Sequence, residues 1–397
     1  MVTVAEATSI IHQHLFLPGK ERIRLETTEG RILAETIKAD RDFPPFDRVA
    51  MDGIAIPFNS FREGWRDFKI ENMQAAGQPR TTLRDQQNCI EVMTGAMLPV
   101  GCDTVIRYED LSIVNKIAKI KIESIEKGQS IHPRAHDARK GDILLSPGNR
   151  IAASEVALLA TVGRAEAEVL AFPATAIVST GNELVDIRDL PQPHQIRKSN
   201  SYVLQAALTT MGGRPVLFHL PDDRNLLEKG LVKILADHQL IILSGGVSKG
   251  KLDFVPGVLE SLGVKQLFHQ VSQRPGKPFW FGATRKHVVF ALPGNPVSTF
   301  MCLYRYIKPW LLKSMGVEAP VAYARLGKDF SFIPPLTYFL QVKIKNEKGT
   351  LLAWPVEGGG SGDFANLKDV DGFLELPLDR YDFKEGEVFP YIPFRRE

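Results

Sequence analysis

The hydrophobic pattern changes twice along the chain. Between about residues 172 and 320, short apolar runs alternate with amphipathic segments, a pattern typical of strand–helix–strand units. Such units imply a mostly parallel sheet with helices on both faces. We expect strands at 174–180, 214–221, 238–244, 265–271 and 287–293, and helices at 199–211, 223–236, 253–262 and 296–315.

The flanking segments favour β structure. Residues 66–145 contain short β-like runs separated by turn signals, which predicts a small β-rich domain. After about residue 320 the pattern is again β, with apolar residues alternating with polar ones over 338–345. The predicted class is therefore α/β plus β, in a multidomain chain. The domains expected are a helical linking domain (1–39 and 141–171), a small β-rich domain (40–140), a central α/β domain (172–320) and a C-terminal β domain (321–397).

Two local signals lie near the N-terminus. Thr3 and Glu6 fit a capping box, which predicts a helix over residues 3–16 with Leu15 on its apolar face. Residues 40–55 contain a double proline that excludes a helix, so this stretch is expected to be a loop or a sheet edge.

Composition narrows the class of protein. The 397 residues are 44% hydrophobic and carry a net charge of only +3, so we expect neither a disordered chain nor a dedicated nucleic-acid binder. No apolar run is long enough to span a bilayer, and the N-terminus does not resemble a signal peptide. Three cysteines without metal-ligand spacing are best explained as free thiols, so a cytoplasmic protein is expected.

Three small-residue segments follow predicted strands. They are 179–183 (STGNE), 244–250 (SGGVSKG) and 292–298 (LPGNPVS). A parallel sheet would place all three at the same edge, where open α/β sheets bind ligands. Small residues let backbone N–H groups approach a phosphate or another oxyanion. Each segment alone could be an ordinary tight turn, and the functional interpretation depends on their being together.

Charged residues flank these segments. Arg274 and Lys277 lie in a proline-rigidified turn and could bind an oxyanion, although a solvated basic turn is the simpler alternative. Glu183 and Asp253 could hold Mg²⁺ beside a phosphate, although Asp253 could instead cap a helix. Neither standard nucleotide-binding motif, GxxxxGK[ST] or GxGxxG, is present. His132 and His136 are four residues apart, but Pro133 lies between them, so no zinc-binding helix is predicted there.

The motifs taken together resemble the bacterial MoeA family, molybdopterin molybdenumtransferase, which is related to the C-terminal domain of gephyrin. They span nearly the whole chain in the family's order, which makes the resemblance highly specific. The matching segments are PPFDRVAMDG (44–53), MTGAMLPVGCDTV (93–105), STGNELV (179–185), SGGVSKGKLDF (244–254), RPGKPFWFG (274–282), LPGNPVS (292–298) and GGGSGDFANLKDVDGFLELP (358–377).

The resemblance implies an activity and an assembly. The family inserts molybdate into adenylylated molybdopterin and releases AMP, with Mg²⁺ assisting. It implies a homodimer of four-domain subunits, with a cleft between the molybdopterin-binding-like α/β domain of one subunit and the small β-rich domain of the other. A transient contact with the molybdopterin adenylyltransferase is also possible. Small molecules are thus the expected substrates, with no nucleic-acid or membrane partner.

The family's functional residues carry over to matching positions. Asp52, Glu183, Asp253 and Lys277 would be catalytic, with Glu183 and Asp253 as metal ligands. Asp52 and Thr94 would reach the cleft from the partner subunit. The residues expected to bind substrate are Thr94, Asp137, Arg274, Ser244, Gly245, Gly246, Ser248, Pro293, Gly294, Asn295, Pro296, Ser298 and Ser361.

Some positions depart from the family pattern. Arg274 stands where Lys is usual, Lys251 where an acid is usual, and His132 where Arg is frequent; Arg48 and Val49 replace Asn and Ser. Three alternatives therefore stay open: a tungstate-specific paralogue, a non-catalytic scaffold of the gephyrin kind, and the adenylyltransferase of the preceding step. The last is disfavoured, because that enzyme has no evident use for the flanking domains.

Overall fold

The chain forms two compact units. The computed structural model describes all residues except 248–252, 357, 359, 361, 396 and 397. The first unit comprises Met1–Ala34, Arg150–Ala152 and Glu168–Glu397, and the second comprises Glu35–Asn149 and Ala153–Ala167. The finer division into four domains stays a prediction.

A six-stranded sheet forms the centre of the first unit. Four neighbouring strands are parallel, as expected, whereas β20 runs antiparallel to both of its neighbours, β21 and β18. We did not predict β20, because its apolar run directly follows a proline-rich turn. In spatial order the strands are β16 (Val216–Leu220), β13 (Thr175–Thr180), β17 (Leu240–Ser244), β21 (Val288–Leu292), β20 (Pro278–Ala283) and β18 (Lys265–Gln270).

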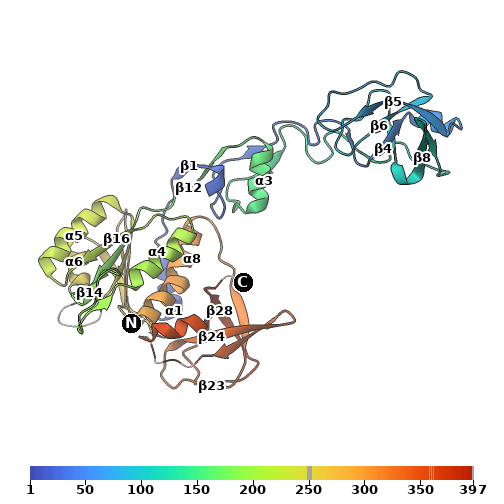
Figure 1. Cartoon of the computed structure of the whole chain (residues 1–397). Coiled ribbons are helices and arrows are strands. Elements are labelled where there is room, and N and C mark those ends of the chain that lie inside the picture. The colour runs from blue at the N-terminus through green and yellow to red at the C-terminus, as the bar shows by residue number, and fades with distance from the viewer. Residues whose placement is uncertain (248–252, 357, 359, 361, 396–397) are drawn as a thin grey trace. The chain divides into compact units, whose positions relative to one another are not determined.

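Helices cover both faces of this sheet (Figure 1). On one face, α5 (Arg224–Asp237) and α6 (Val255–Ser261) pack on alternate strand residues such as Ile241. Neighbouring Ile242 points to the other face, because successive strand side chains alternate. That face is covered by α1 (Val4–His12), α4 (Asn200–Thr210), α7 (Pro296–Cys302), a π-helical segment (Leu303–Ile307) and α8 (Lys308–Ser314).

Helix α1 begins as predicted but ends early. Thr3 accepts a hydrogen bond from the Glu6 backbone N–H at 3.2 Å, and the Glu6 carboxylate accepts one from the Thr3 N–H at 2.7 Å. The helix ends at His12, so Leu15 lies outside it and is exposed, contrary to the expectation.

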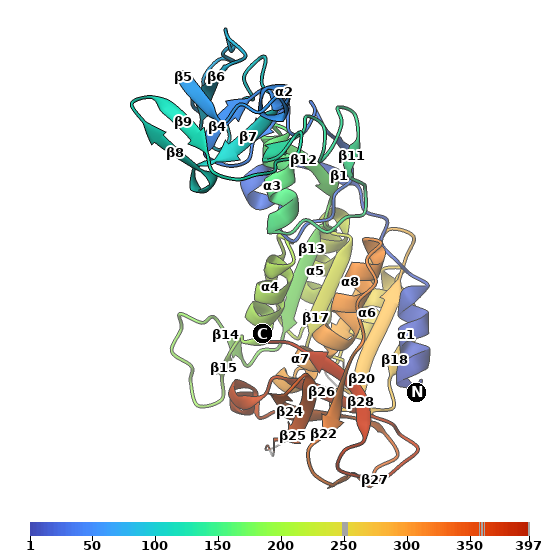
Figure 2. The ribbon, with the colours of Figure 1, turned by 90° about the vertical axis from the view of Figure 1, so that its right-hand side faces the viewer.

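The C-terminal β structure is built on one long strand, β24 (Thr337–Glu347). Its inner side chains, including Leu340 and Val342, pack in a separate core. The short strand β19 (Gln273–Arg274) pairs with β24 and ties this part to the α/β sheet; Figure 2 shows it gathered at one end of that sheet. The other strands are β22 (Ala322–Leu326), β23 (Phe330–Ser331), β25 (Thr350–Pro355), β26 (Gly372–Leu376), β27 (Asp382–Phe383) and β28 (Val388–Pro393).

The second unit contains a six-stranded sheet with apolar clusters on both faces. Strand β4 (Gly53–Ile56) lies between two others in this sheet, so the expectation of a loop or edge for 40–55 is wrong at the end of that stretch. The sheet order is β7 (Thr104–Arg107), β4, β6 (Asn88–Val92), β5 (Asp67–Gln74), β9 (Ile117–Ile120) and β8 (Leu111–Val114).

Shorter elements complete the chain. Helices α2 (Phe58–Arg62) and α3 (Ala153–Thr161) belong to the second unit. The paired short strands are β1 (Lys20–Arg24) with β12 (Glu166–Leu170), β2 (Ile37–Lys38) with β11 (Ile143–Leu145), β3 (Arg48–Val49) with β10 (Ile131–His132), and β14 (Leu184–Val185) with β15 (Ile196–Arg197).

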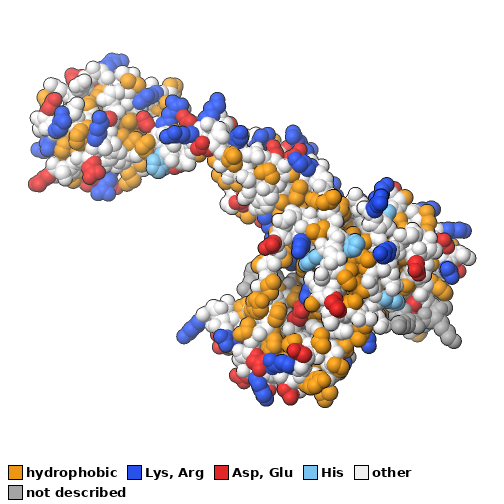
Figure 3. Space-filling view, turned by 180° about the vertical axis from the view of Figure 1, so that it is seen from behind, with side chains coloured by type: hydrophobic (Ala, Val, Ile, Leu, Met, Phe, Trp, Pro, Cys, Tyr) orange, Lys and Arg blue, Asp and Glu red, His pale blue; other side chains and the backbone are white. Residues whose placement is uncertain are grey.

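The surface carries both signs of charge. Lys and Arg side chains are interspersed with Asp and Glu over the face seen in Figure 3, in keeping with a net charge of +3. No helix among the described residues is both long and apolar enough to cross a membrane.

Candidate active site

The three small-residue segments lie at one edge of the central sheet. Strands β13, β17 and β21 are parallel and end in register, with Ser179 beside Ser244 and Ser244 beside Leu292. The turns that follow them therefore line a single cleft of about 620 Å³. The predicted site residues in its lining are Glu183, Asp253, Ser244, Gly245, Gly246, Pro293, Gly294, Asn295 and Pro296.

The close packing of the turns requires glycine. Gly245 has a φ of +101°, and a Cβ there would lie 2.6 Å from the backbone oxygen of Thr180. At Gly246 a Cβ would lie 2.9 Å from the Thr180 hydroxyl. The first and second turns are thus in direct contact, and only a residue without a side chain fits between them.

Hydrogen bonds fix the second and third turns relative to each other. The Asn200 amide at the start of α4 donates to the Ser244 hydroxyl at 2.7 Å and to the Gly294 carbonyl at 2.8 Å. The buried Thr180 hydroxyl, by contrast, finds no hydrogen-bond partner among the described residues, although Thr180 lines the cleft. A buried unsatisfied hydroxyl is costly, so it is a ready contact for a ligand oxygen.

Three carboxylates line the same cleft: Glu183, Asp222 and Asp253. A Cβ at Gly181 would lie 2.6 Å from a Glu183 oxygen, so glycine lets this carboxylate fold back against the turn. Helix α6 has Phe254 as its N-cap, so the structure does not use Asp253 for that role. Arg197 and Lys198 also line the cleft, and Lys198 pairs with Asp186 at 3.2 Å. The carboxylates beside small-residue turns fit a hard cation such as Mg²⁺.

A second cleft of about 610 Å³ adjoins the first. The two share Pro278, Pro293 and Asn295 in their linings. The second is lined by Arg274, Lys277 and Ser298, and its described lining residues include no carboxylate. The described carboxylates of the two clefts thus all lie in the first cleft, whereas Arg274 and Lys277 lie in the second.

A buried glutamine holds the basic turn. Gln273 is fully buried; its amide nitrogen donates to the Gly276 carbonyl at 3.0 Å and its oxygen accepts from the Tyr306 hydroxyl. On one side of this anchor, the Arg274 guanidinium lies 5.8 Å from the centre of the Phe332 ring. The turn is therefore fixed at its base, while Arg274 and Lys277 themselves are exposed.

The second unit brings two predicted residues together. The Thr94 backbone N–H donates to the exposed Asp52 carboxylate at 2.6 Å, and this bond is the main reason that the pKa of Asp52 lies below its usual value. A Cβ at the next residue, Gly53, would lie 1.9 Å from the Ile106 oxygen. Asp137, also in the second unit, is in contact with His132 and His136.

Two residues expected to bind substrate cannot be placed in the structure. Ser248 and Ser361 lie outside the described residues, and so does Lys251, where the chain departs from the family pattern.

Four residues that shape the two clefts were not predicted from the sequence: Thr180, Asn200, Asp222 and Gln273. Thr180 belongs to a motif that we noted and Gln273 directly precedes one, but only burial distinguishes them from their neighbours. Asn200 is the first residue of α4 and Asp222 precedes α5, and neither belongs to a motif.

Comparisons with known proteins cover nearly the whole chain. Three family models match in order: MoeA N-terminal region (domain I and II) over residues 2–163, probable molybdopterin binding domain over 176–313, and MoeA C-terminal region (domain IV) over 323–394.

Full-length relatives agree with these matches. The chain is 41% identical over 396 residues to a Synechocystis protein named molybdopterin molybdenumtransferase, covering 98% of this chain and 99% of that one. It is 31% identical to a Bacillus subtilis protein of the same name, covering 95% and 90%. A crystal structure of a molybdopterin biosynthesis MoeA protein from Pyrococcus horikoshii matches with a TM-score of 0.84 at 29% identity, covering 100% of both chains.

Proposed function

The chain belongs to the MoeA family, and on this premise we propose that it is a molybdopterin molybdenumtransferase. It would insert molybdate into adenylylated molybdopterin and release AMP, as a step of molybdenum cofactor biosynthesis. The observation that carries this proposal is the pair of adjoining clefts, one with carboxylates in its lining and the other with Arg274 and Lys277 and no described carboxylate. Such a pair suits a metal-bound phosphate ester beside an oxyanion.

The first cleft would bind the nucleotide end of the substrate. Backbone N–H groups of the glycine turns can approach the phosphates closely, and the unpartnered Thr180 hydroxyl can donate to a phosphate oxygen. Glu183 and Asp253 would hold Mg²⁺, which would supply charge neutralisation at the anhydride.

The second cleft would bind molybdate. Lys277 offers a point charge and Arg274 a planar fork of donors, and the buried Gln273 keeps their turn in place before the oxyanion arrives. Preformed positive charge requires little reorganisation during transfer, which is the main electrostatic advantage of an enzyme site over water.

A second subunit would complete the site. We propose a homodimer in which Asp52, Thr94 and Asp137 act on the substrate bound by the partner's α/β domain. The support is the family resemblance at these positions, together with the exposed Asp52 carboxylate held by Thr94. A cytoplasmic location and a transient contact with the adenylyltransferase remain proposals of the same kind.

Molybdate-dependent release of AMP tests the reaction. The purified chain with adenylylated molybdopterin and Mg²⁺ should release AMP only when molybdate is added, and Glu183→Gln should slow release by about 100-fold or more. Binding without release would support the scaffold alternative instead. Release with tungstate but not molybdate would indicate the paralogue.

Mixing two inactive variants tests the shared site. Asp52→Asn and Glu183→Gln should each be inactive as homodimers, whereas a re-equilibrated mixture should regain about a quarter of wild-type activity, because half the dimers then contain one intact site. No recovery, with subunit exchange demonstrated, would contradict the shared cleft.

A further inference from the structure

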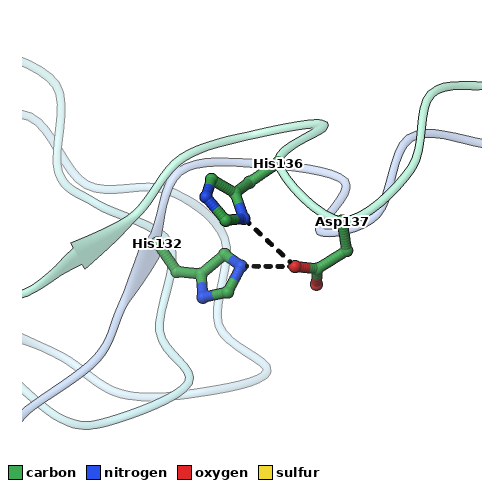
Figure 4. A group of neighbouring side chains, drawn as sticks. All are labelled: His132, His136 and Asp137. Atoms are coloured by element: carbon green, nitrogen blue, oxygen red, sulfur yellow. Dashed lines mark hydrogen bonds and ion pairs between the residues drawn. The ribbon is translucent and has the colours of Figure 1, made fainter.

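Two histidines and an aspartate meet in the second unit (Figure 4). The Nε2 atom of His132 lies 2.8 Å from Oδ1 of Asp137, and the Nδ1 atom of His136 lies 3.3 Å from the same oxygen. The two imidazole rings meet edge to face, with their centres 4.8 Å apart. One ligand atom from each residue lies within 4.8 Å of the other two.

The backbone, rather than a helix, brings these side chains together. His132 belongs to β10, which pairs with β3 opposite Arg48. The chain then bends at Ala135, whose φ is +61°, and its N–H donates to the Pro44 carbonyl at 3.0 Å. The Asp137 N–H donates to the Phe43 carbonyl at 2.9 Å. Pro133 excludes a helix, as the sequence indicated, but this anchored loop makes a helix unnecessary.

Neighbouring charges are already paired. The Arg134 guanidinium donates to Asp42 at 2.7 Å, and its backbone N–H donates to Asp47 at 2.9 Å. These bonds hold the loop to the preceding segment of the same unit. They also direct the Arg134 charge toward Asp42, so this arginine is not the partner that Asp137 uses.

We propose that His132, His136 and Asp137 bind a divalent transition-metal ion of the Zn²⁺ class. Two imidazole nitrogens and one carboxylate oxygen form a ligand set that suits Zn²⁺ or Co²⁺, whereas Mg²⁺ prefers oxygen ligands. Metal–ligand distances of roughly 2.0–2.2 Å place tetrahedral ligand atoms about 3.4 Å apart. Two of the three contacts are already that short, and the third requires only rotation of the exposed His136 side chain.

Three protein ligands leave a fourth position open. Structural zinc sites usually use four protein ligands, whereas sites with three keep a place for water or a bound molecule. The proposed site is therefore accessible to an additional ligand. It shares Asp137 with the proposed transferase function but goes beyond it, because the two histidines have no role in that proposal and can be tested separately.

Zinc titration of the metal-free chain tests this site. Calorimetry with Mg²⁺ in excess should show one Zn²⁺ bound per chain, and either His132→Ala or His136→Ala should lower the affinity by about 100-fold, since loss of even an outer-shell partner costs roughly 10–100-fold. The matched control is His194→Ala, because His194 is exposed in the first unit and should leave the affinity unchanged. Glu183→Gln should also bind Zn²⁺ normally.

Cobalt provides a second readout. The wild-type chain with Co²⁺ should show visible ligand-field bands that both histidine variants lose. His136 has a side chain that is 63% exposed, so its replacement should leave the fold intact. Absence of tight Zn²⁺ binding, or equal affinity in wild type and both variants, would overturn the proposal. Zinc affinity and AMP release are measured separately, so either of these results could occur in a chain that releases AMP normally.

Discussion

Replacing Gly245 with alanine should disrupt the contact between two turns of the candidate site. The backbone at Gly245 is left-handed, which costs an L-residue about 1–2 kcal/mol. The new Cβ would lie 2.6 Å from the Thr180 oxygen, so the turn must move. That movement endangers the 3.1 Å hydrogen bond from the Gly245 N–H to the Leu292 carbonyl, which contributes about 1 kcal/mol.

The expected loss is therefore about 2–3 kcal/mol in the free energy of unfolding of the first unit. A shift in the midpoint of urea unfolding, at unchanged slope, measures it. AMP release should fall as well, because the displaced turn no longer lies against Thr180. A loss below about 0.5 kcal/mol would refute the reasoning, since that is the range of ordinary surface substitutions.

Two other glycines provide matched controls. At Gly294 a Cβ would meet only the Gly245 Cα, at 3.8 Å, so Gly294→Ala should leave stability nearly unchanged although it lies in the same cleft. At Gly257, inside α6, a Cβ would meet nothing within 4 Å. Gly257→Ala should stabilise the protein by about 0.5–1 kcal/mol, because alanine favours helix more than glycine does. The contrast among the three separates steric conflict from glycine replacement in general.

Three further predictions concern the charged and buried residues. Lys277→Ala should raise the KM for molybdate by about tenfold or more, because a hydrogen bond to a charged group contributes about 1.5–3 kcal/mol; an unchanged KM in steady-state kinetics would mean that the turn is merely solvated. Gln273→Leu should lower the free energy of unfolding by about 2–4 kcal/mol, measured with urea, because it leaves the Tyr306 hydroxyl and the Gly276 carbonyl without their partner. Asp52 has a lowered pKa, so its hydrogen bond stabilises the fold above the unfolded-state value of 3.8 and this contribution is lost as pH falls through the folded-state pKa. Asp52→Asn should therefore lose less stability than wild type between pH 7 and about pH 3, and identical pH profiles from urea unfolding would contradict this.

The sequence predicted the elements with regular patterns. The helix expected over 223–236 is α5, and the Asp223 carboxylate caps it by accepting from the Leu226 N–H at 2.9 Å. Parallel strands were expected to bring the small-residue turns to one edge, and the register of β13, β17 and β21 does so. These features depend on local periodicity and on the geometry of parallel sheets, which are readable from the chain alone.

Features that depend on contacts between residues far apart in the sequence were either not predicted or predicted wrongly. Strand β4 begins eight residues after the double proline, and its place inside a sheet follows from partners at 88–92 and 104–107. Gln273 looks like any polar turn residue until Tyr306, 33 positions away, is packed against it. The convergence of His132, His136 and Asp137 likewise requires the loop anchored at Phe43 and Pro44.

The central claim is that the glycine turns and the basic turn together bind a nucleotide-linked pterin beside a metal oxyanion. A crystal structure of the chain with AMP, Mg²⁺ and molybdate tests it most directly. We predict density for the AMP phosphate over the turns at Gly245 and Gly294, and for the oxyanion beside Lys277. Well-ordered ligands bound elsewhere, with both clefts filled only by solvent, would contradict the account.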